Sequence, residues 1–445
     1  MLFIAQGLQA GLGFPKENID MKTPKFLSGY TRLEKSWVVY DIGNSAFTLL
    51  VTTLIPIWFN SLCEKAGMNS VDYLAAWSFA TSFATILMIF TGPVFGALAD
   101  HRGYKKTLFT IVLVLGTVSC ACMGIIGILP LPPSLIWVFY LVIYVIAKVA
   151  YQTSLVLYDS MLVDVTEPER MDLVSSNGYA WGYIGSCIPF IASLALYLLG
   201  SQGKMPMSIA ILFGFLLTAA WWYSVTIPLL KLYRQKYYIE TGGSYVRESF
   251  ARIGRTLRTL ATKERKVLLF LLAFFLYIDG VYTIIDEAVA IGTALGLNQI
   301  GLLVVLLLTQ IVAFVFAILF GKLSQKYSTI TLISVSIIGY FAVAIYALFM
   351  KTLWQFGIMA FVVGVFQGAI QALSRSYYAK IIPPDNSGEF FGIYDICGKG
   401  AAFVGTMLIG VTTKLTGSVN IGVGTLAFLF LGGLILLRLA DRAKG

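Results

Sequence analysis

The chain has 445 residues, of which 58% are hydrophobic and 12% are charged, and its formal net charge is +10. A soluble domain carries roughly 25% charged residues, so this composition excludes an ordinary water-soluble protein. The basic residues form no continuous face, which argues against a nucleic-acid-binding protein. The five cysteines have no metal-ligand spacing, and we expect neither a metal nor a cofactor.

Apolar runs follow one another along the whole chain. A helix that spans a bilayer needs about 20 apolar residues, and backbone groups in lipid must be paired within the segment, so we expect helices rather than strands. The runs cover residues 36–60, 73–98, 107–129, 135–163, 175–200, 206–230, 267–294, 300–321, 328–350, 353–380, 389–412 and 418–438. The sequence therefore predicts an all-α integral membrane protein with twelve transmembrane helices.

The distribution of Lys and Arg predicts the orientation. One set of alternate loops holds most of them, whereas the opposite loops hold only Lys65, Lys204, Lys351 and Lys414. By the positive-inside rule, both termini are predicted to be cytoplasmic in a multi-pass protein of the cell (inner) membrane. Residues 164–172 hold more acidic than basic residues, but acidic residues count little in this rule.

The loop 231–266 is the longest internal connection, with ten Lys and Arg residues against three acidic ones. Apolar residues at helical spacing predict a basic amphipathic helix on the inner membrane surface. These residues are Val246, Phe250, Ile253, Leu257 and Leu260. Short matches recur in the same order on both sides of this loop, which indicates a duplicated six-helix unit. We expect a cytoplasmic N-terminal segment (1–35), a six-helix lobe (36–230), the linker (231–266) and a second, pseudo-symmetric six-helix lobe (267–440).

Ionisable residues within a bilayer are costly and usually face the bundle interior or an aqueous path. Here they are confined to the first, fourth, seventh, tenth and eleventh runs, where helical spacing collects them on shared faces. The candidate substrate-binding or coupling residues are Asp41, Asn44, Lys148, Gln152, Asp159, Asp279, Tyr282, Asp286, Gln367, Gln371, Arg375, Asp395 and Lys399.

This pattern predicts a central cavity. Lys148 and Arg375 are assigned to an anionic group of the substrate, and Asp41 or Asp279 to a coupling proton. The alternative is that some carboxylates only pair with basic residues to hold the lobes together. It applies most to Asp159, and to Asp395 with Lys399, which form an i, i+4 pair that could neutralise itself.

A second motif lies between the second and third runs. Gly96 permits close approach of helices, Asp100 can sit at the N-terminus of a neighbouring helix, and the basic residues after it can anchor at the membrane face. We interpret Gly96, Asp100, Arg102 and Gly103 as a gating loop, with an ordinary basic turn as the alternative. Gln325 stands at the corresponding place in the second half.

This loop follows the pattern of the major facilitator superfamily, which the chain resembles over nearly its full length. More narrowly, it is similar to the bacterial family of unknown major facilitators that is related to vacuolar autophagy-related amino-acid effluxers. The matching segments are 40–47, 175–185, 275–283, 371–376, 389–392 and 398–399. The strongest match is the segment 371–376. The resemblance implies twelve helices and alternating access.

We therefore expect a secondary transporter, a symporter or antiporter, for an amino acid or another small organic solute, anionic ones included. A proton or another ion is expected to be coupled to the solute, and the protein is expected to be a monomer in the bilayer that binds no nucleic acid. A flippase for a lipid or lysolipid on the same fold is the main alternative, and a non-transporting receptor is another.

A membrane enzyme is excluded as a reading of this sequence. His101 is the sole histidine, which leaves no zinc-protease motif and no Ser-His-Asp triad. The segment from Gly392 to Lys399 has the wrong glycine spacing for an ATP-binding loop, and no Ser or Thr follows the lysine.

Overall fold

The computed structural model describes residues 28–240, 253–256, 258–260 and 264–443, without the side chains of residues 289, 290, 299, 300, 303 and 399–403. Regular structure in this part of the chain is helical, apart from an isolated bridge between His101 and Ile239. Eleven helical segments of the described chain are long and apolar enough to cross a membrane. The predicted all-helical membrane fold is therefore confirmed.

The helices of the first half cover the first six predicted runs. They are α2 (Arg32–Thr52), α3 (Leu54–Lys65), α4 (Ser70–Ala99), α5 (Tyr104–Ile126), α6 (Pro133–Ser160), the short α7 (Leu162–Val165), α8 (Met171–Ser201) and α9 (Met207–Leu232).

The helices of the second half cover the remaining runs. They are α11 (Arg265–Asp286), α12 (Ala288–Ala294), α13 (Gln299–Leu323), α14 (Thr329–Ala347), α15 (Leu353–Ile381), α16 (Ser387–Thr416), α17 (Val419–Gly424) and α18 (Leu426–Arg442). The 30 residues of α16 give it a length of about 45 Å, which is more than a bilayer core requires.

Four of the predicted runs are each divided into two helices, and the division of the fourth, at Met161, separates only the short α7 from α6. The first run breaks at Thr53, where the backbone leaves the helical region (φ −132°, ψ −86°) and the side-chain hydroxyl donates to the Leu49 carbonyl. A threonine that bonds back to the preceding turn bends a helix. The seventh run divides at Glu287 and the last at Thr425. The first helix of each half is therefore short: α2 ends after 21 residues and α11 after 22 residues.

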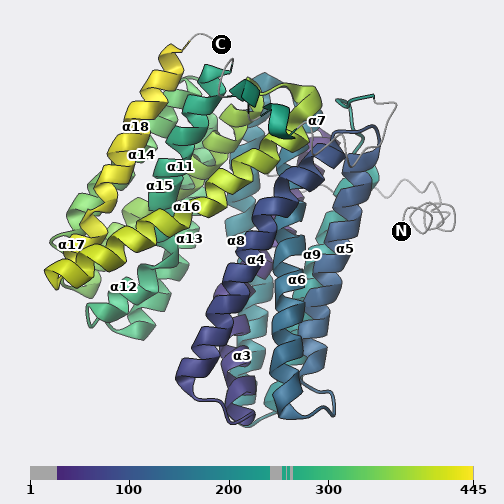
Figure 1. Cartoon of the computed structure of the whole chain (residues 1–445), viewed down its shortest axis with the longest axis vertical. Coiled ribbons are helices and arrows are strands. Elements are labelled where there is room, and N and C mark those ends of the chain that lie inside the picture. Colours follow the sequence, from purple (N-terminus) through teal and green to yellow (C-terminus); the bar gives the residue numbers. More distant parts are fainter. Residues whose placement is uncertain (1–27, 241–252, 257, 261–263, 444–445) are drawn as a thin grey trace.

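The helices form two groups. In Figure 1, α2–α9 lie on one side and α11–α18 on the other, and each group packs mainly on itself. The groups meet chiefly where α4 and α6 contact α16 and where α8 contacts α13 and α15. We call the end with residues 100–103, 166–170, 324–328 and 382–386 the closed end, because the groups touch there. The opposite end, where they diverge, is the open end.

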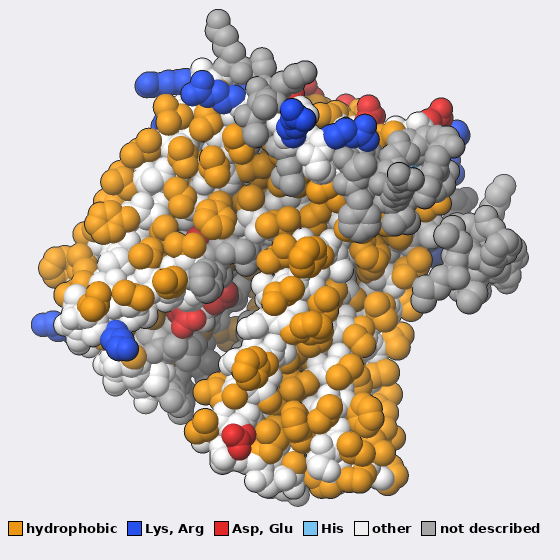
Figure 2. All heavy atoms as spheres, in the orientation of Figure 1, with side chains coloured by type: hydrophobic (Ala, Val, Ile, Leu, Met, Phe, Trp, Pro, Cys, Tyr) orange, Lys and Arg blue, Asp and Glu red, His pale blue; other side chains and the backbone are white. Residues whose placement is uncertain are grey.

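The surface has the polarity that a bilayer requires. Large apolar side chains are exposed along the helices, among them Phe79, Trp354 and Phe428, which are 77%, 78% and 74% exposed. Figure 2 shows a mainly apolar surface, with Lys and Arg gathered above all at the closed end. The same view shows a hollow between the two groups of helices, in which acidic side chains are visible.

The predicted linker helix is described only at its end. Residues 253–256 and 258–260 are helical, whereas residues 241–252 lie outside the described part. The start of the linker is not helical: residues 233–240 run beside the loop between α4 and α5, and the Ile239 N–H donates to the Asp100 carbonyl (2.9 Å).

Candidate functional site

A buried arginine joins the two groups of helices near the closed end. Arg375 of α15 is 2% exposed. Its Nη1 donates to Asp159 Oδ1 of α6 (2.9 Å), and its Nη2 lies 3.6 Å from Asp41 Oδ2 of α2. Its Nε donates to Ser175 Oγ of α8 (2.9 Å) and its Nη2 to the Ser175 carbonyl (3.0 Å). One side chain of the second group thus binds three helices of the first.

Three aromatic rings enclose the same guanidinium. The rings of Trp37, Tyr158 and Tyr179 have their centroids 4.7, 5.5 and 4.4 Å from Arg375 Cζ. Each distance is within the range of a cation–π interaction. All three rings belong to the first group of helices, so Arg375 enters a cup made by that group alone.

The cup is built from local sequence patterns. Trp37 and Asp41 are one turn apart on α2, and Tyr158 and Asp159 are adjacent at the end of α6. The Tyr158 hydroxyl donates to Asp41 Oδ2 (2.9 Å), and Asn44 Nδ2 donates to Asp41 Oδ1 (3.1 Å). Gly178 leaves room for them, since a Cβ there would lie 2.5 Å from Asp41 Oδ2. We call Trp37, Asp41, Tyr158, Asp159 and Tyr179 the aromatic cup.

A second ionic contact between the groups lies closer to the closed end. Asp172, at the start of α8, lies 2.7 Å from Lys380 Nζ and accepts hydrogen bonds from Ser376 (2.6 Å) and Thr329 (2.7 Å). Asp172 is 2% exposed, so its charge is compensated by these partners rather than by water.

The predicted gating loop forms the closed end itself. Asp100 accepts the backbone N–H groups of Gly388 (2.7 Å) and Glu389 (3.0 Å), which are the first unpaired donors of α16. The position predicted for Asp100, at the N-terminus of a neighbouring helix, is therefore observed. Gly96 lies against the backbone of Gly388, with no room for a Cβ on either residue.

The other two residues of the loop do not bridge the groups. Arg102 forms an exposed ion pair with Glu240 (3.5 Å), and pairs of this kind contribute little. Gly103 has φ +79°, a backbone conformation that favours glycine, and its N–H donates to Gln235 Oε1 (3.0 Å). Lys105, one turn later, does bridge: its Nζ lies 2.8 Å from Ser387 Oγ and 3.4 Å from Asp164 Oδ2.

Asp164 ties the start of the linker to this loop region. Its carboxylate accepts the Tyr233 hydroxyl (2.5 Å) and the backbone N–H groups of Lys236 (2.9 Å) and Tyr237 (3.0 Å). Burial, and the neighbouring Asp164 carboxylate, raise the pKa of Tyr233 well above its ordinary value. The segment 164–172 departs from the positive-inside pattern. Two of its acidic residues are buried partners of lysines: Asp164 pairs with Lys105, and Asp172 pairs with Lys380.

Deeper in the molecule, Gln152 of α6 donates to Asp395 of α16 (2.8 Å). Both residues lie about 12 Å from the closed ends of their helices.

Lys148 lies one turn before Gln152 on α6. Its ammonium is 5.8 Å from the centroid of the Tyr144 ring, and it interacts electrostatically with Asp286, which is exposed at the end of α11. Tyr282 lies one turn before Asp286 and interacts electrostatically with both Asp395 and Asp159. These residues place polar groups between the two halves toward the open end.

Asp279 lies apart from the aromatic cup. It is completely buried between α11 and α16, where both carboxylate oxygens accept the Gly405 N–H (3.0 Å each) and Oδ1 accepts the Thr283 hydroxyl (3.3 Å). Among the described side chains, no basic group contacts it. The structure therefore separates the two carboxylates that the sequence suggests for proton coupling.

The remaining predicted site residues are placed less specifically. Gln367 and Gln371 are buried on α15, about two turns and one turn before Arg375, respectively. The side chain of Lys399 lies outside the described part, so the predicted Asp395–Lys399 pair stays a prediction.

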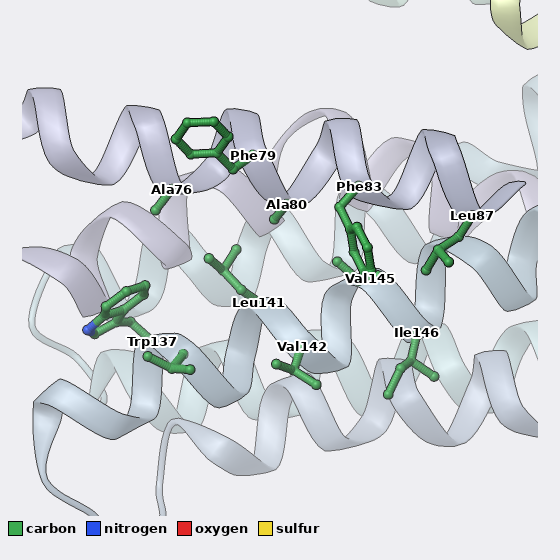
Figure 3. Close-up of a pocket in the computed structure, with 11 residues that line it drawn as sticks. Ala76, Phe79, Ala80, Phe83, Leu87, Trp137, Leu141, Val142, Val145 and Ile146 are labelled. Atoms are coloured by element: carbon green, nitrogen blue, oxygen red, sulfur yellow. The ribbon is translucent and has the colours of Figure 1, made fainter.

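An apolar groove opens between α4 and α6 toward the open end. It has a volume of about 540 Å³ and is lined by apolar side chains from Ala76 to Leu87 and from Trp137 to Ile146. Figure 3 shows Phe83 of α4 directed toward Val145 of α6, with Leu87 farther along the same side of α4. Lys148 follows this lining by half a turn on α6.

The aromatic residues of the cup were not predicted from the sequence, and neither were Lys105, Asp164, Asp172, Ser175 and Lys380. A signal existed for two of them, because Trp37 precedes Asp41 by four residues and Tyr158 adjoins Asp159. Of the others, the charged residues and Ser175 lie near helix ends, where polar residues usually face water, and Tyr179 lies within α8.

Two groups of membrane helices bridged by charged residues at one end are the architecture of a major facilitator superfamily transporter. FucP, a transporter of that superfamily crystallised in its outward conformation, has the same fold, with a TM-score of 0.69 at 12% identity over 94% of this chain and 100% of FucP.

The sequence comparisons specify the family. A profile of the family described as vacuole effluxer Atg22 like matches residues 31–169 and 163–445. The uncharacterized MFS-type transporter YxiO of Bacillus subtilis (strain 168) is 40% identical over 411 residues, which are 92% of this chain and 94% of YxiO. The chain therefore belongs to the Atg22-like family of MFS-type transporters, and the predicted family is confirmed.

Fungal members are more distant. Autophagy-related protein 22-1 of Aspergillus niger is 27% identical over 302 residues, which are 61% of this chain and 47% of the fungal protein. The chain thus spans about half the length of this fungal relative.

Proposed function

We propose that this chain is a secondary active transporter that moves a small organic solute across the membrane by alternating access. The observation that carries the proposal is Arg375, a buried cation of one group of helices that binds two carboxylates of the other. Such costly groups in a membrane protein mark substrate and ion pathways. Their position between two diverging groups of helices suits a contact that breaks when the transporter changes state.

The architecture that we propose has twelve spans in two six-helix lobes, 36–230 and 267–440, with α16 as one of the spans. The linker 231–266 joins the lobes, and residues 1–35 precede them. The closed end carries most of the basic loops, so we assign it, with both termini, to the cytoplasmic side of the cell membrane. Transport by a monomer is the simplest arrangement, because the residues proposed for the site come from one chain.

Coupling to a proton is proposed to use Asp279. A charged carboxylate within a membrane costs several kcal/mol unless it is paired, and the described neighbours of Asp279 supply an amide and a hydroxyl but no cation. Asp41 is instead engaged by Arg375, Tyr158 and Asn44. Proton binding at Asp279 would remove this cost, and its release would restore it.

Lys148 is the basic residue that we propose for an anionic group of the substrate. Its side chain is partly exposed and interacts electrostatically with Asp286 of the other half, whereas the guanidinium of Arg375 is occupied on its hydrogen-bonding edges and on its faces. An amino acid is the substrate class that the resemblance to vacuolar amino-acid effluxers implies.

The groove between α4 and α6 favours a second candidate function, the translocation of a lipid or lysolipid. A hydrocarbon chain could lie along its apolar lining while a headgroup reaches Lys148. This candidate differs from the first in requiring an apolar tail on the substrate.

The two candidates are distinguished with purified protein in liposomes. Accumulation of a radiolabelled amino acid under an inward or outward pH gradient would support solute transport. Movement of a fluorescent lysolipid between leaflets, without solute uptake, would support translocation of lipid. Neither activity above that of protein-free liposomes would contradict both.

A further inference from the structure

The aromatic cup of the first lobe is complete without Arg375. The Trp37 Nε1 donates to the Tyr158 carbonyl (3.1 Å), and the Tyr158 hydroxyl lies within hydrogen-bonding distance of the Trp37 carbonyl (3.1 Å) and of Asp41 (2.9 Å). The rings of Trp37 and Tyr158 stack at 4.3 Å with an interplanar angle of 16°. These contacts lie within the first lobe, so they persist when the second lobe moves.

Arg375 belongs to the lobe that moves. Alternating access, on which this inference rests, separates α15 from α2, α6 and α8 when the closed end opens. The guanidinium then leaves with α15, and the cup keeps two carboxylates and the faces of three aromatic rings. Asp41 is buried and Asp159 is partly exposed. Two carboxylates this close repel each other when no cation lies between them, so a cation that enters from the opened end would be bound by both.

From this geometry we infer that the aromatic cup is a binding site for an organic cation, such as the ammonium or guanidinium group of a substrate, and that Arg375 fills it in the state described here. The chemistry of the walls selects the ligand. Aromatic faces at 4.4–5.5 Å attract a weakly hydrated organic cation. They provide none of the oxygen ligands that a hard metal cation needs in number. The side chain of Asp159 is 19% exposed, so one wall of the cup is accessible even with Arg375 in place.

Exchange between Arg375 and a ligand would link binding to the change of state. A ligand that neutralises Asp41 and Asp159 stabilises the state in which Arg375 has left, and an empty cup favours its return. A population shift of this kind follows from differential affinity for the two states.

The first experiment removes the guanidinium of Arg375 from the aromatic cup. Thermal unfolding of the purified full chain carrying Arg375→Gln is measured with methylguanidinium chloride and with sodium chloride at equal ionic strength. We expect methylguanidinium to raise the melting temperature of R375Q by a few degrees and to leave the melting temperature of the wild type unchanged. The effect should be lost in the double variants R375Q/W37L and R375Q/D159N. Lys380→Gln, which removes the partly exposed basic partner of Asp172 between the lobes, is the control and gains no response. An equal response to both salts, or the same response in K380Q, would overturn the inference.

The second experiment uses the wild-type chain and does not depend on the folding of R375Q. Exchange of labelled arginine is compared with exchange of citrulline, its neutral isostere, and of glutamate in liposomes. We expect arginine to be preferred at least tenfold, and Trp37→Leu to raise the KM for arginine while Trp222→Leu, which removes a buried tryptophan elsewhere in the same lobe, does not.

The outcomes separate this inference from the proposed function. Exchange of citrulline or glutamate that is unaffected by Trp37→Leu would leave transport standing and refute the cation site. A specific methylguanidinium effect without exchange of any solute would support the site and contradict transport of these solutes.

Discussion

Gly96 of α4 and Gly388 of α16 meet backbone to backbone, so a Cβ added to either would overlap the carbonyl group of the other. The crossing continues one turn away, where a Cβ on Gly392 would lie 2.5 Å from Pro93 Cα. Small residues four apart on both helices permit such close approach in membranes. The closed end is thus sealed by packed backbones, and Asp100 adds its hydrogen bonds at the same crossing.

Replacing Gly388 by alanine is expected to favour the state open at this end. Overpacking costs about 1–3 kcal/mol, which corresponds to a shift of roughly 5- to 150-fold between two states. The measurement is maleimide labelling of a cysteine introduced at Ala372, which is buried between α8 and α15, in a chain without the native cysteines. Gly410→Ala is the control, because no atom lies within 4 Å of its added Cβ. Equal labelling in the two variants would contradict the role of the crossing.

Asp100→Ala is expected to weaken the same contact by removing an anionic cap from the N-terminus of α16. Loss of a cap costs about 1 kcal/mol, so labelling at position 372 should rise about fivefold. Asp385→Ala removes the same charge from an exposed position two residues before α16 and should have no comparable effect. If both substitutions act alike, the general electrostatics of the loop rather than the cap is responsible.

Arg375→Gln is expected to destabilise the folded protein by about 3–5 kcal/mol, because it leaves the buried Asp41 and the partly exposed Asp159 without a cation. Asp159→Asn should recover part of this loss, since it removes one of the uncompensated charges. A double-mutant cycle of unfolding free energies is therefore expected to give a coupling of about 1–3 kcal/mol. Strictly additive effects would show that the 2.9 Å contact contributes no net stability.

Asp279→Asn is expected to leave a folded protein, because the amide oxygen can still accept the Gly405 N–H. Accumulation driven by a pH gradient should be lost, whereas exchange of solute without a gradient should persist. Asp72→Asn, at the exposed start of α4, is the control for the loss of a carboxylate. Unchanged accumulation in D279N would remove this residue from the coupling mechanism.

Much of the fold could be predicted because hydrophobicity and chain length decide it. All the apolar runs are helical, and their ends agree with the observed helices within a few residues. The division of α2 from α3 at Thr53 could not be predicted, because a threonine within an apolar run is compatible with an unbroken helix. The break depends on the hydrogen bond that this particular hydroxyl makes.

The candidate site was predictable in its charges but not in their partners. Asp41, Asp159 and Arg375 stand out because ionisable residues are rare in apolar segments. That they converge from α2, α6 and α15 follows from tertiary packing, which a single sequence does not encode locally. The same holds for Trp37 and Tyr179, since 63 aromatic residues offer no sign of which ones surround a cation.

The interruptions at Thr53 and Glu287 fall at matching places in the first helix of each half. A helix that is already interrupted bends there at lower cost than an intact one. The outer pieces α3 and α12 can therefore swing inward over the hollow while α2 and α11 keep their lengths and their contacts near the closed end. In the proposed alternating-access cycle, the two breaks would thus act as a matched pair of joints, and the open end could close without a tilt of the whole lobes.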